Sequence, residues 1–286
     1  MTHIQTRWIL ALDVDRTLLT DDYRLLPQVR DAVQRVRQTG AIISLASARG
    51  PVALDIVLQD LGEIDYAICF GGALILRRER SAWAPVPGAA STSMALDDDA
   101  REALVLHCRQ LGLSVAAYSM DTVYVEEMDS QLQREFSHTG DRYEICRLCD
   151  ISEPLFKFLV ISKIEEVNKL TSLYMQFAAQ ASCAMSQLNY LEVGPRGVSK
   201  GGGLASLAAS IGVDRQRTVA IGDGENDLSM FAWAGLSIAM GNASQQVRDA
   251  ANWTTASNAE AGVAVAIDRL IDMTWQAVAS DKLEKI

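Results

Sequence analysis

A short apolar run that ends in two carboxylates constrains the fold of this chain more than any other feature. Residues 9–12 read Ile-Leu-Ala-Leu, and Asp13 and Asp15 follow with only Val14 between them. A continuous apolar run of this kind is typical of a strand buried on both faces of a parallel sheet. Charges are costly inside such a strand, so we expect them at its carboxyl end, where open α/β sheets bind ligands. Two close carboxylates repel each other, and a bound divalent cation usually offsets this repulsion.

A second acidic segment lies far downstream and favours a functional interpretation of the first. Residues 221–227 read Ile-Gly-Asp-Gly-Glu-Asn-Asp and follow another apolar run. A strand followed by an acidic turn without function is the simpler alternative for either segment alone. Two such strand ends in one chain indicate a shared site.

The order of the predicted elements indicates two domains. Strands at 41–47 and 66–70 alternate with helices that begin at Pro27 and Pro51, and the same alternation resumes after Pro195. This order predicts a doubly wound, Rossmann-like parallel sheet. The middle of the chain predicts an α+β domain, with helices at 97–112 and 165–179 and strands at 114–118, 122–125, 155–162 and 185–193. We therefore expect a discontinuous core of residues 1–83 and 189–286, with an inserted cap at 84–188.

Composition excludes several classes of function. The net charge of −10 argues against general binding to nucleic acid or to an anionic membrane. No apolar run is long enough to cross a bilayer, and Asp13 interrupts the N-terminal one. The odd number of cysteines, 5, predicts reduced thiols and a cytoplasmic protein. Cys146 and Cys149 have the spacing of a zinc knuckle, but no second pair follows them.

Four motifs together resemble those of the haloacid dehalogenase-like hydrolases. They are Asp13-Val-Asp15-Arg-Thr17, Ser47-Ala-Arg49, Lys200 within Gly-Val-Ser-Lys-Gly, and Gly222-Asp223-Gly-Glu-Asn226-Asp227. Their order and spacing are similar to those of the Cof-type (class IIB) branch, whose cap is inserted between the second and third motifs. Each motif is weak alone, and the resemblance covers nearly the whole chain.

The resemblance implies a phosphatase that works through a phospho-aspartate. Asp13 would be the nucleophile, Asp15 the acid and base, and Lys200 the cation that neutralises the phosphoryl group. Mg²⁺ would bind Asp13, the backbone carbonyl of Asp15, and Asp223, while Asp227 would orient Lys200 or a bound water. The residues that would contact phosphate or substrate are Thr17, Ser47, Ala48, Arg49, Gly72 and Asn226.

Three positions depart from the family pattern. Glycine is usual where Arg16 and Ala48 stand, and asparagine is usual where Gly71 stands. Arg16 either forms a surface ion pair with Asp21 or Asp22, or reaches the site entrance to bind a second anionic group of the substrate. The loss of an amide at Gly71 bears on the choice of leaving group more than on the chemistry.

Three functions are compatible with these residues. The first is a Mg²⁺-dependent phosphatase of small phosphorylated metabolites, sugar or polyol phosphates in particular, acting as a monomer or homodimer. A phosphohexomutase would share the nucleophile and the acid/base pair, but would return the phosphoryl group to the sugar. A non-catalytic protein that binds sugar phosphates would explain the changes at Arg16 and Gly71, although intact Asp13 and Lys200 argue against it. The sequence does not identify the substrate.

Overall fold

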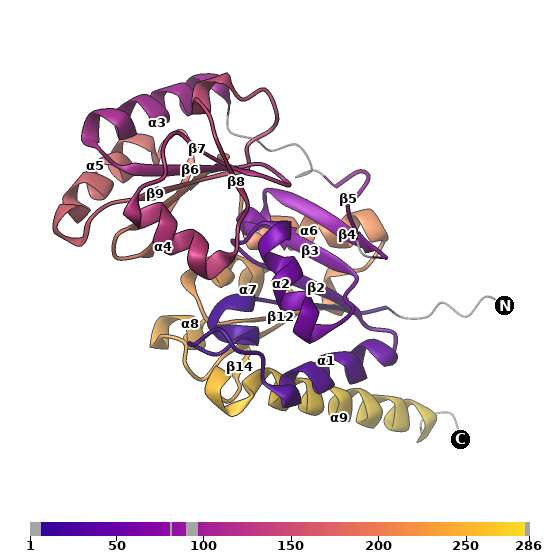
Figure 1. Cartoon of the computed structure of the whole chain (residues 1–286). Coiled ribbons are helices and arrows are strands. Elements are labelled where there is room, and N and C mark those ends of the chain that lie inside the picture. The colour runs from indigo at the N-terminus through magenta and orange to yellow at the C-terminus, as the bar shows by residue number, and fades with distance from the viewer. Residues whose placement is uncertain (1–6, 81, 90–96, 284–286) are drawn as a thin grey trace.

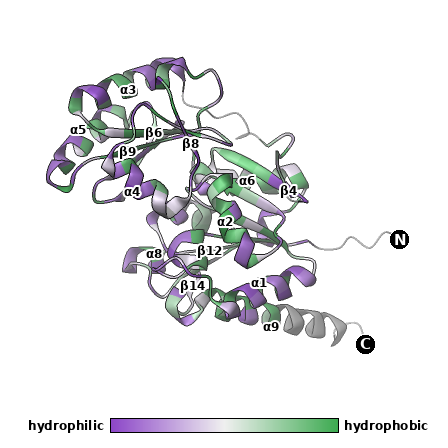
Figure 2. Cartoon of the chain, viewed as in Figure 1, coloured by the Kyte–Doolittle hydropathy of each residue, from purple (hydrophilic) through white to green (hydrophobic). Residues whose placement is uncertain are grey.

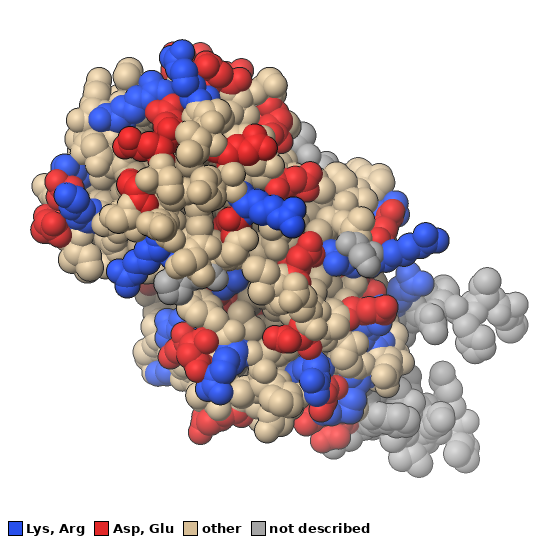
Figure 3. Space-filling view, viewed as in Figure 1, with Lys and Arg blue, Asp and Glu red and all other residues tan. Residues whose placement is uncertain are grey.

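A computed structural model describes residues 7–80, 82–89 and 97–283 of the chain. They form two layered domains, with the smaller lying over one end of the larger (Figure 1). None of the described helices combines the length and the apolar character that crossing a bilayer requires. On the face shown in Figure 3, basic and acidic side chains are interspersed.

The core domain is built on an eight-stranded sheet in the order β14-β13-β12-β1-β2-β3-β4-β5. The strands from β14 to β3 pair in parallel, as predicted, and β4 and β5 add an antiparallel edge. Their bounds are β1 Ile9–Leu12, β2 Ile42–Ala46, β3 Tyr66–Cys69, β4 Leu74–Glu79, β5 Ala82–Pro85, β12 Thr218–Gly222, β13 Leu236–Ala239 and β14 Trp253–Thr254.

Helices cover both faces of this sheet because alternate strand residues point to opposite sides. Leu10 and Leu12 of β1 belong to one apolar cluster with α1, α2 and α9, whereas Ile9 and Ala11 belong to another with α6, α7 and α8. Apolar residues are concentrated where these helices face the sheet (Figure 2). The helix bounds are α1 Pro27–Gln38, α2 Pro51–Leu61, α6 Lys200–Ile211, α7 Leu228–Trp233, α8 Gln245–Asp249 and α9 Gly262–Leu283.

The cap domain is built on a six-stranded sheet in the order β10-β11-β9-β6-β7-β8. Helices α3 and α5 pack on one face of it, and the apolar side chains of α4 join the cluster that continues into the core domain. The bounds are α3 Asp98–Leu111, β6 Ser114–Tyr118, β7 Val123–Val125, α4 Ser130–Thr139, β8 Tyr143–Ile145, β9 Lys157–Ile161, α5 Val167–Phe177, β10 Ser182–Gln187 and β11 Tyr190–Gly194.

The cap departs from the sequence predictions in three respects. Helix α4 and strand β8 were not predicted, and β8 pairs in parallel with β7 rather than antiparallel. The single strand expected at 185–193 is a hairpin of β10 and β11. The predicted hairpin of β6 and β7 is present.

The sheets that β5 and β11 join bear on the domain boundaries expected at residues 84 and 189. Strand β5 pairs with β4 in the core sheet, and β11 pairs with β9 in the cap sheet. The expected division would cut β5 in two and place β11 in the core, whereas backbone hydrogen bonds tie all of β5 to the core sheet and β11 to the cap sheet. We propose that the chain enters the cap between β5 and α3 and leaves it between β11 and α6.

Candidate active site

Two neighbouring strands bring the predicted carboxylates together. Leu12 of β1 is in register with Ile221 of β12, and the N–H of Asp13 donates to the carbonyl of Ile221 at 2.9 Å. Asp13 and Asp223 therefore follow adjacent parallel strands at the same edge of the sheet. The chain turns sharply after β1, over Val14–Leu18, where the backbone of Asp15 and Arg16 is not helical and the N–H of Leu19 donates to the carbonyl of Val14 at 2.9 Å.

Three buried aspartates form the centre of the site. One carboxylate oxygen from each of Asp13, Asp223 and Asp227 lies within 4.8 Å of the others. Burial, and then the charge of Asp227, raises the pKa of Asp13 well above its ordinary value. Burial also raises the pKa of Asp223, while a hydrogen bond from Thr17 opposes that shift. The cluster therefore holds more negative charge than its surroundings readily accommodate.

Lys200 is the buried cation of this cluster. Its Nζ lies 2.5 Å from Oδ1 of Asp13 and 2.6 Å from Oδ1 of Asp227, and its side chain is 1% exposed. Burial alone would lower the pKa of Lys200, but the charges of Asp13 and Asp227 outweigh it, so the pKa is raised. Lys200 is thus held as a cation directly against the predicted nucleophile.

Local sequence explains how a lysine at the start of α6 reaches this position. Ser199 caps the helix, with its Oγ accepting from the N–H of Gly202 at 3.1 Å. A Cβ on Gly201 would lie 2.1 Å from a carbonyl oxygen of α7, and one on Gly203 would lie 2.5 Å from Ile68 of β3. The glycines after Lys200 therefore allow α6 to pack closely against the core.

Asp227 supports the cluster through both of its oxygens. Oδ1 accepts from Lys200, and Oδ2 accepts from the backbone N–H groups of Asp223 and Gly224, each at 3.0 Å. These contacts fix the turn that carries Asp223. The sequence expectation that Asp227 orients Lys200 matches this contact, which leaves neither Asp227 oxygen without a partner.

Asp15 and Arg49 form a bidentate ion pair beside the cluster. Nε and Nη2 of Arg49 donate to the two carboxylate oxygens of Asp15 at 2.9 and 2.6 Å. Ser47 is buried, and its Oγ accepts from the N–H of Arg49 at 3.1 Å. The structure thus places Arg49 on the predicted acid/base residue. Ala48 offers its carbonyl to Lys157 of the cap, at 3.1 Å.

The other predicted contact residues have different surroundings. Thr17 donates from Oγ1 to Oδ1 of Asp223 at 3.0 Å, so its hydroxyl supports a carboxylate. A Cβ on Gly72 would lie 2.2 Å from the carbonyl oxygen of Ser199, which indicates a packing role for this glycine. Asn226 is exposed. Gly71 has a φ of 65°, a region that glycine and asparagine adopt more readily than other residues.

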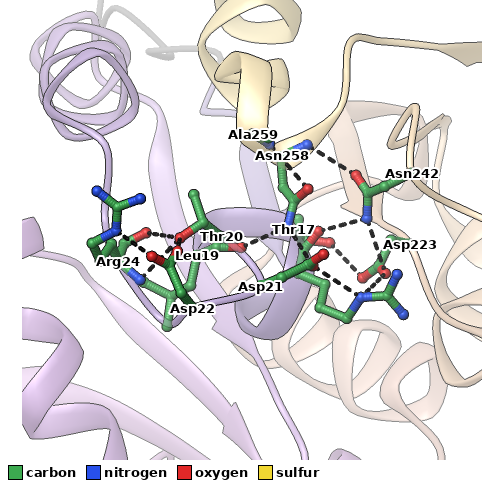
Figure 4. Close-up of polar contacts among 11 residues, drawn as sticks. Thr17, Leu19, Thr20, Asp21, Asp22, Arg24, Asp223, Asn242, Asn258 and Ala259 are labelled. Carbon is green, nitrogen blue, oxygen red and sulfur yellow. Dashed lines mark hydrogen bonds and ion pairs between the residues drawn. The ribbon is translucent and has the colours of Figure 1, made fainter.

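Two asparagines that the sequence analysis did not single out complete the site (Figure 4). Nδ2 of Asn242 lies 3.3 Å from Oδ2 of Asp223, and Oδ1 of Asn242 accepts from the N–H of Asn258 at 2.9 Å. Nδ2 of Asn258 donates to Asp21 at 3.1 Å. Asn242 follows β13 closely, so the strand-end rule applied to 13–15 and 221–227 would have found it.

Polar cap residues lie close to the Ser47–Arg49 segment. Besides its bond to Ala48, Nζ of Lys157 lies 4.5 Å from the ring centroid of Tyr118 and 3.9 Å from Oε1 of Glu192. Burial raises the pKa of Glu135 on α4, and a hydrogen bond with Tyr190 opposes that shift. Hydroxyl, carboxyl and ammonium groups of the cap therefore gather on the side that faces the core.

Comparison with known proteins agrees with this geometry. The family model of the haloacid dehalogenase-like hydrolases matches residues 10–267. The chain is 28% identical over 266 residues to the 5-amino-6-(5-phospho-D-ribitylamino)uracil phosphatase YitU of Bacillus subtilis, across 90% of this chain and 95% of that protein. A haloacid dehalogenase-like hydrolase from Bacteroides thetaiotaomicron superposes with a TM-score of 0.81 at 27% identity, across 92% of this chain and 99% of that one.

A more distant structure shows the same architecture of core and cap. A sugar phosphatase of subclass IIB superposes with a TM-score of 0.77 at 19% identity, across 92% of this chain and 98% of that one. Because the family model matches residues 10–267, the chain belongs to the haloacid dehalogenase-like hydrolase family. Within that family it is a phosphatase with an inserted cap, and the predicted α/β fold is confirmed.

Proposed function

We propose that this protein is a Mg²⁺-dependent phosphatase that hydrolyses sugar or polyol phosphates through a phospho-aspartate on Asp13. The observation that carries the proposal is the position of Asp13, buried at the end of β1 with Lys200 at 2.5 Å and Asp223 in the same cluster. A carboxylate held this way offers a nucleophile, and the cation beside it attracts an anionic phosphoryl group.

The chemistry of the donors fits Mg²⁺. When Asp13, Asp223 and Asp227 are ionised, the charge of Lys200 leaves two negative charges in excess, which a divalent cation would balance. Asp13, Asp223 and the backbone carbonyl of Asp15 would hold the ion, since the oxygens of Asp227 already have partners. Hard oxygen ligands of this kind suit Mg²⁺, and the bound ion would draw charge from the phosphoryl oxygens.

The residues of the chain would divide the reaction into two steps. A carboxylate oxygen of Asp13 attacks phosphorus while the bond to the leaving oxygen breaks, and Asp15 gives that oxygen its proton. Asp15, now ionised, takes a proton from water, whose oxygen attacks phosphorus and releases Asp13 and inorganic phosphate. Lys200 stays charged throughout and lowers the repulsion between Asp13 and the phosphoryl group.

The ion pair of Asp15 with Arg49 sets a condition on these reaction steps. Both oxygens of Asp15 accept from the guanidinium, so Arg49 must release at least one of them before Asp15 can carry a proton. A phosphoryl group is a competing bidentate partner for a guanidinium. Substrate binding would therefore draw Arg49 toward the phosphoryl oxygens and free Asp15.

The cap supports a polyhydroxylated leaving group. Nζ of Lys157 donates to the carbonyl of Ala48 and lies 3.9 Å from Oε1 of Glu192. Tyr190 hydrogen-bonds Glu135, on which the charge of Lys157 also acts. Such groups hydrogen-bond sugar and polyol hydroxyls, and their opposite charges do not favour a strongly charged partner. The relative from Bacillus subtilis is named for a substrate with a phosphorylated ribityl chain, which is a polyol phosphate.

The test compares Asp13→Asn with Asp31→Asn, a change at an exposed ion pair on α1. Phosphate release from a panel of sugar and polyol phosphates should vanish in Asp13→Asn and persist in the control. Asp15→Asn, given an aryl phosphate with a good leaving group, should accumulate a phosphoryl adduct on Asp13 that mass spectrometry locates. More than a few per cent of activity in Asp13→Asn would contradict the assignment of Asp13 as the nucleophile, and an isomeric sugar monophosphate in place of inorganic phosphate would indicate a mutase.

A further inference from the structure

We propose that Arg16 is a resident cation of the candidate metal site that weakens the affinity of the site for Mg²⁺. The proposal rests on the proposed function only in placing a divalent cation at Asp13 and Asp223. It concerns a residue that stands where the family usually has glycine, and it gives Arg16 a role different from substrate recognition.

The guanidinium lies between one exposed and one buried carboxylate. Nε of Arg16 is 3.2 Å from Oδ1 of Asp21 and 3.9 Å from Oδ2 of Asp223. The side chain of Asp21 is 73% exposed and that of Asp223 only 7%. Water and salt screen an exposed pair strongly and a buried one much less. The side chain of Arg16 is itself 58% exposed, so its charge acts on both carboxylates, and the interaction with Asp223 is screened on one side only.

The backbone holds Arg16 in place in a conformation that side chains disfavour. Its φ is 61°, in the left-handed region, where glycine meets no steric penalty. Nδ2 of Asn242 donates to the carbonyl of Arg16 at 2.9 Å, and the same amide contacts Asp223. The turn after β1 is thus tied to the carboxylate that Arg16 approaches.

A network of amides fixes the exposed partner as well (Figure 4). Asn258 donates to Asp21 at 3.1 Å and to the carbonyl of Leu19 at 3.2 Å, and its own N–H donates to Asn242. The hydrogen bond from Asn258, and then that from Arg16, lowers the pKa of Asp21, so Asp21 is ionised at neutral pH. The contacts close a ring through Arg16, Asp21, Asn258, Asn242 and Asp223.

The ring makes Arg16 a competitor for the negative charge of Asp223. A metal ion bound by Asp223 must either accept a neighbouring positive charge or displace the guanidinium toward Asp21. Both of the anionic partners of Arg16 already belong to the chain. This differs from the expectation that Arg16 reaches out to a second anion of the substrate.

Isothermal titration of the full chain with Mg²⁺, without substrate, tests the proposal directly. Arg16→Gln removes the charge, and Arg16→Gly removes the charge and also relaxes the backbone. Both should tighten Mg²⁺ binding by a similar factor, about 3- to 20-fold for a charge at this separation in a partly buried site. Arg24→Gln is the matched control, because Arg24 is an exposed arginine of the same loop that pairs with Asp22. It should change the Kd less than twofold.

The other outcomes either overturn the proposal or separate it from the proposed function. An unchanged Kd in Arg16→Gln would remove the role of charge, and tightening in Arg16→Gly alone would assign the effect to backbone conformation. An unchanged Kd together with a selective loss of efficiency on bisphosphorylated substrates would place Arg16 on the substrate. Absence of Mg²⁺ binding in every variant would refute the metal site itself, whereas altered Mg²⁺ binding without phosphatase activity would refute only the proposed function.

Discussion

Replacing Lys200 with methionine keeps an unbranched side chain out to Cε and removes the buried ammonium that contacts Asp13 and Asp227. The ammonium is buried with both partners, since the exposed fractions of the three side chains are 1%, 8% and 0%. Removing one partner of a buried ion pair leaves an uncompensated charge and costs about 3–5 kcal/mol. We expect a loss of that size in the free energy of unfolding at pH 7.5 in EDTA.

The matched control is Arg35→Met, which breaks an ion pair of the same length at the surface. Nη2 of Arg35 lies 2.5 Å from Oδ1 of Asp268, but the two side chains are 52% and 58% exposed. Exposed pairs contribute between about 0 and 1 kcal/mol, so this variant should lose far less stability. The shortest distance between the charges is the same in both, so the difference reports burial together with the second carboxylate partner of Lys200.

Urea unfolding followed by tryptophan fluorescence measures the effect in the relevant domain. All 5 tryptophans lie outside residues 98–194, so their signal reports the core domain.

The pH dependence of the loss gives a second test. The pKa of Asp13 is raised in the native state, whereas in the unfolded chain it is near the ordinary value of 3.8, so between these two values the native state binds a proton that the unfolded chain does not. Without Lys200 that native pKa rises further, so the stability lost in Lys200→Met should shrink as the pH falls from 7.5 to 5. A loss below about 1 kcal/mol at pH 7.5, or one that does not change with pH, would refute the reasoning.

Three further predictions follow from packing, the cap and metal binding. Gly201→Ala should lower the free energy of unfolding by about 1–3 kcal/mol, because its Cβ would meet a carbonyl of α7, whereas Gly202→Ala in the same turn should change it by less than about 1 kcal/mol. Lys157→Met should raise the KM for sugar and polyol phosphates about tenfold and leave that for an aryl phosphate nearly unchanged; equal effects would remove Lys157 from leaving-group recognition. Adding Mg²⁺ to protein stripped of metal should raise the Tm more at pH 7.5 than at pH 5, because protons compete with the metal for Asp13 and Asp223, whose pKa values are raised; the opposite order would contradict metal binding there.

Local patterns were sufficient to predict the parallel core and the ends of its strands. The apolar run before Asp13 and the one before Asp223 each specify a strand buried on both faces, because charged residues are excluded from its interior. Parallel pairing then puts their carboxyl ends at one edge of the sheet, whereas the pairing of β1 with β12, which brings these two aspartates together, is seen only in the structure. The start of α6 was equally local, since Ser199 provides its own cap.

The cap was predicted less well because its pairing is less local. Helix α4 has an amphipathic pattern that the prediction missed, whereas β8 is a strand of only three residues that pairs with β7 across the intervening helix α4. The two ends of the cap could not be located from composition, because β5 and β11 are assigned to their domains by hydrogen bonds to strands β4 and β9. Which sheet a short strand joins depends on the tertiary structure around it.

The sequence by itself determined that this protein has a doubly wound core with two acidic strand ends, since apolar runs and turn residues act over a few positions. The tertiary structure decided which groups those carboxylates meet. Lys200 reaches Asp13 from 187 residues away, and Asn242 reaches the carbonyl of Arg16 from 226 residues away. Such contacts depend on how closely α6 packs on the sheet and how the loops after β1 and β13 face each other, which no local pattern encodes. The charge balance at the site, including the place of Arg16 beside Asp223, is therefore a property of the fold.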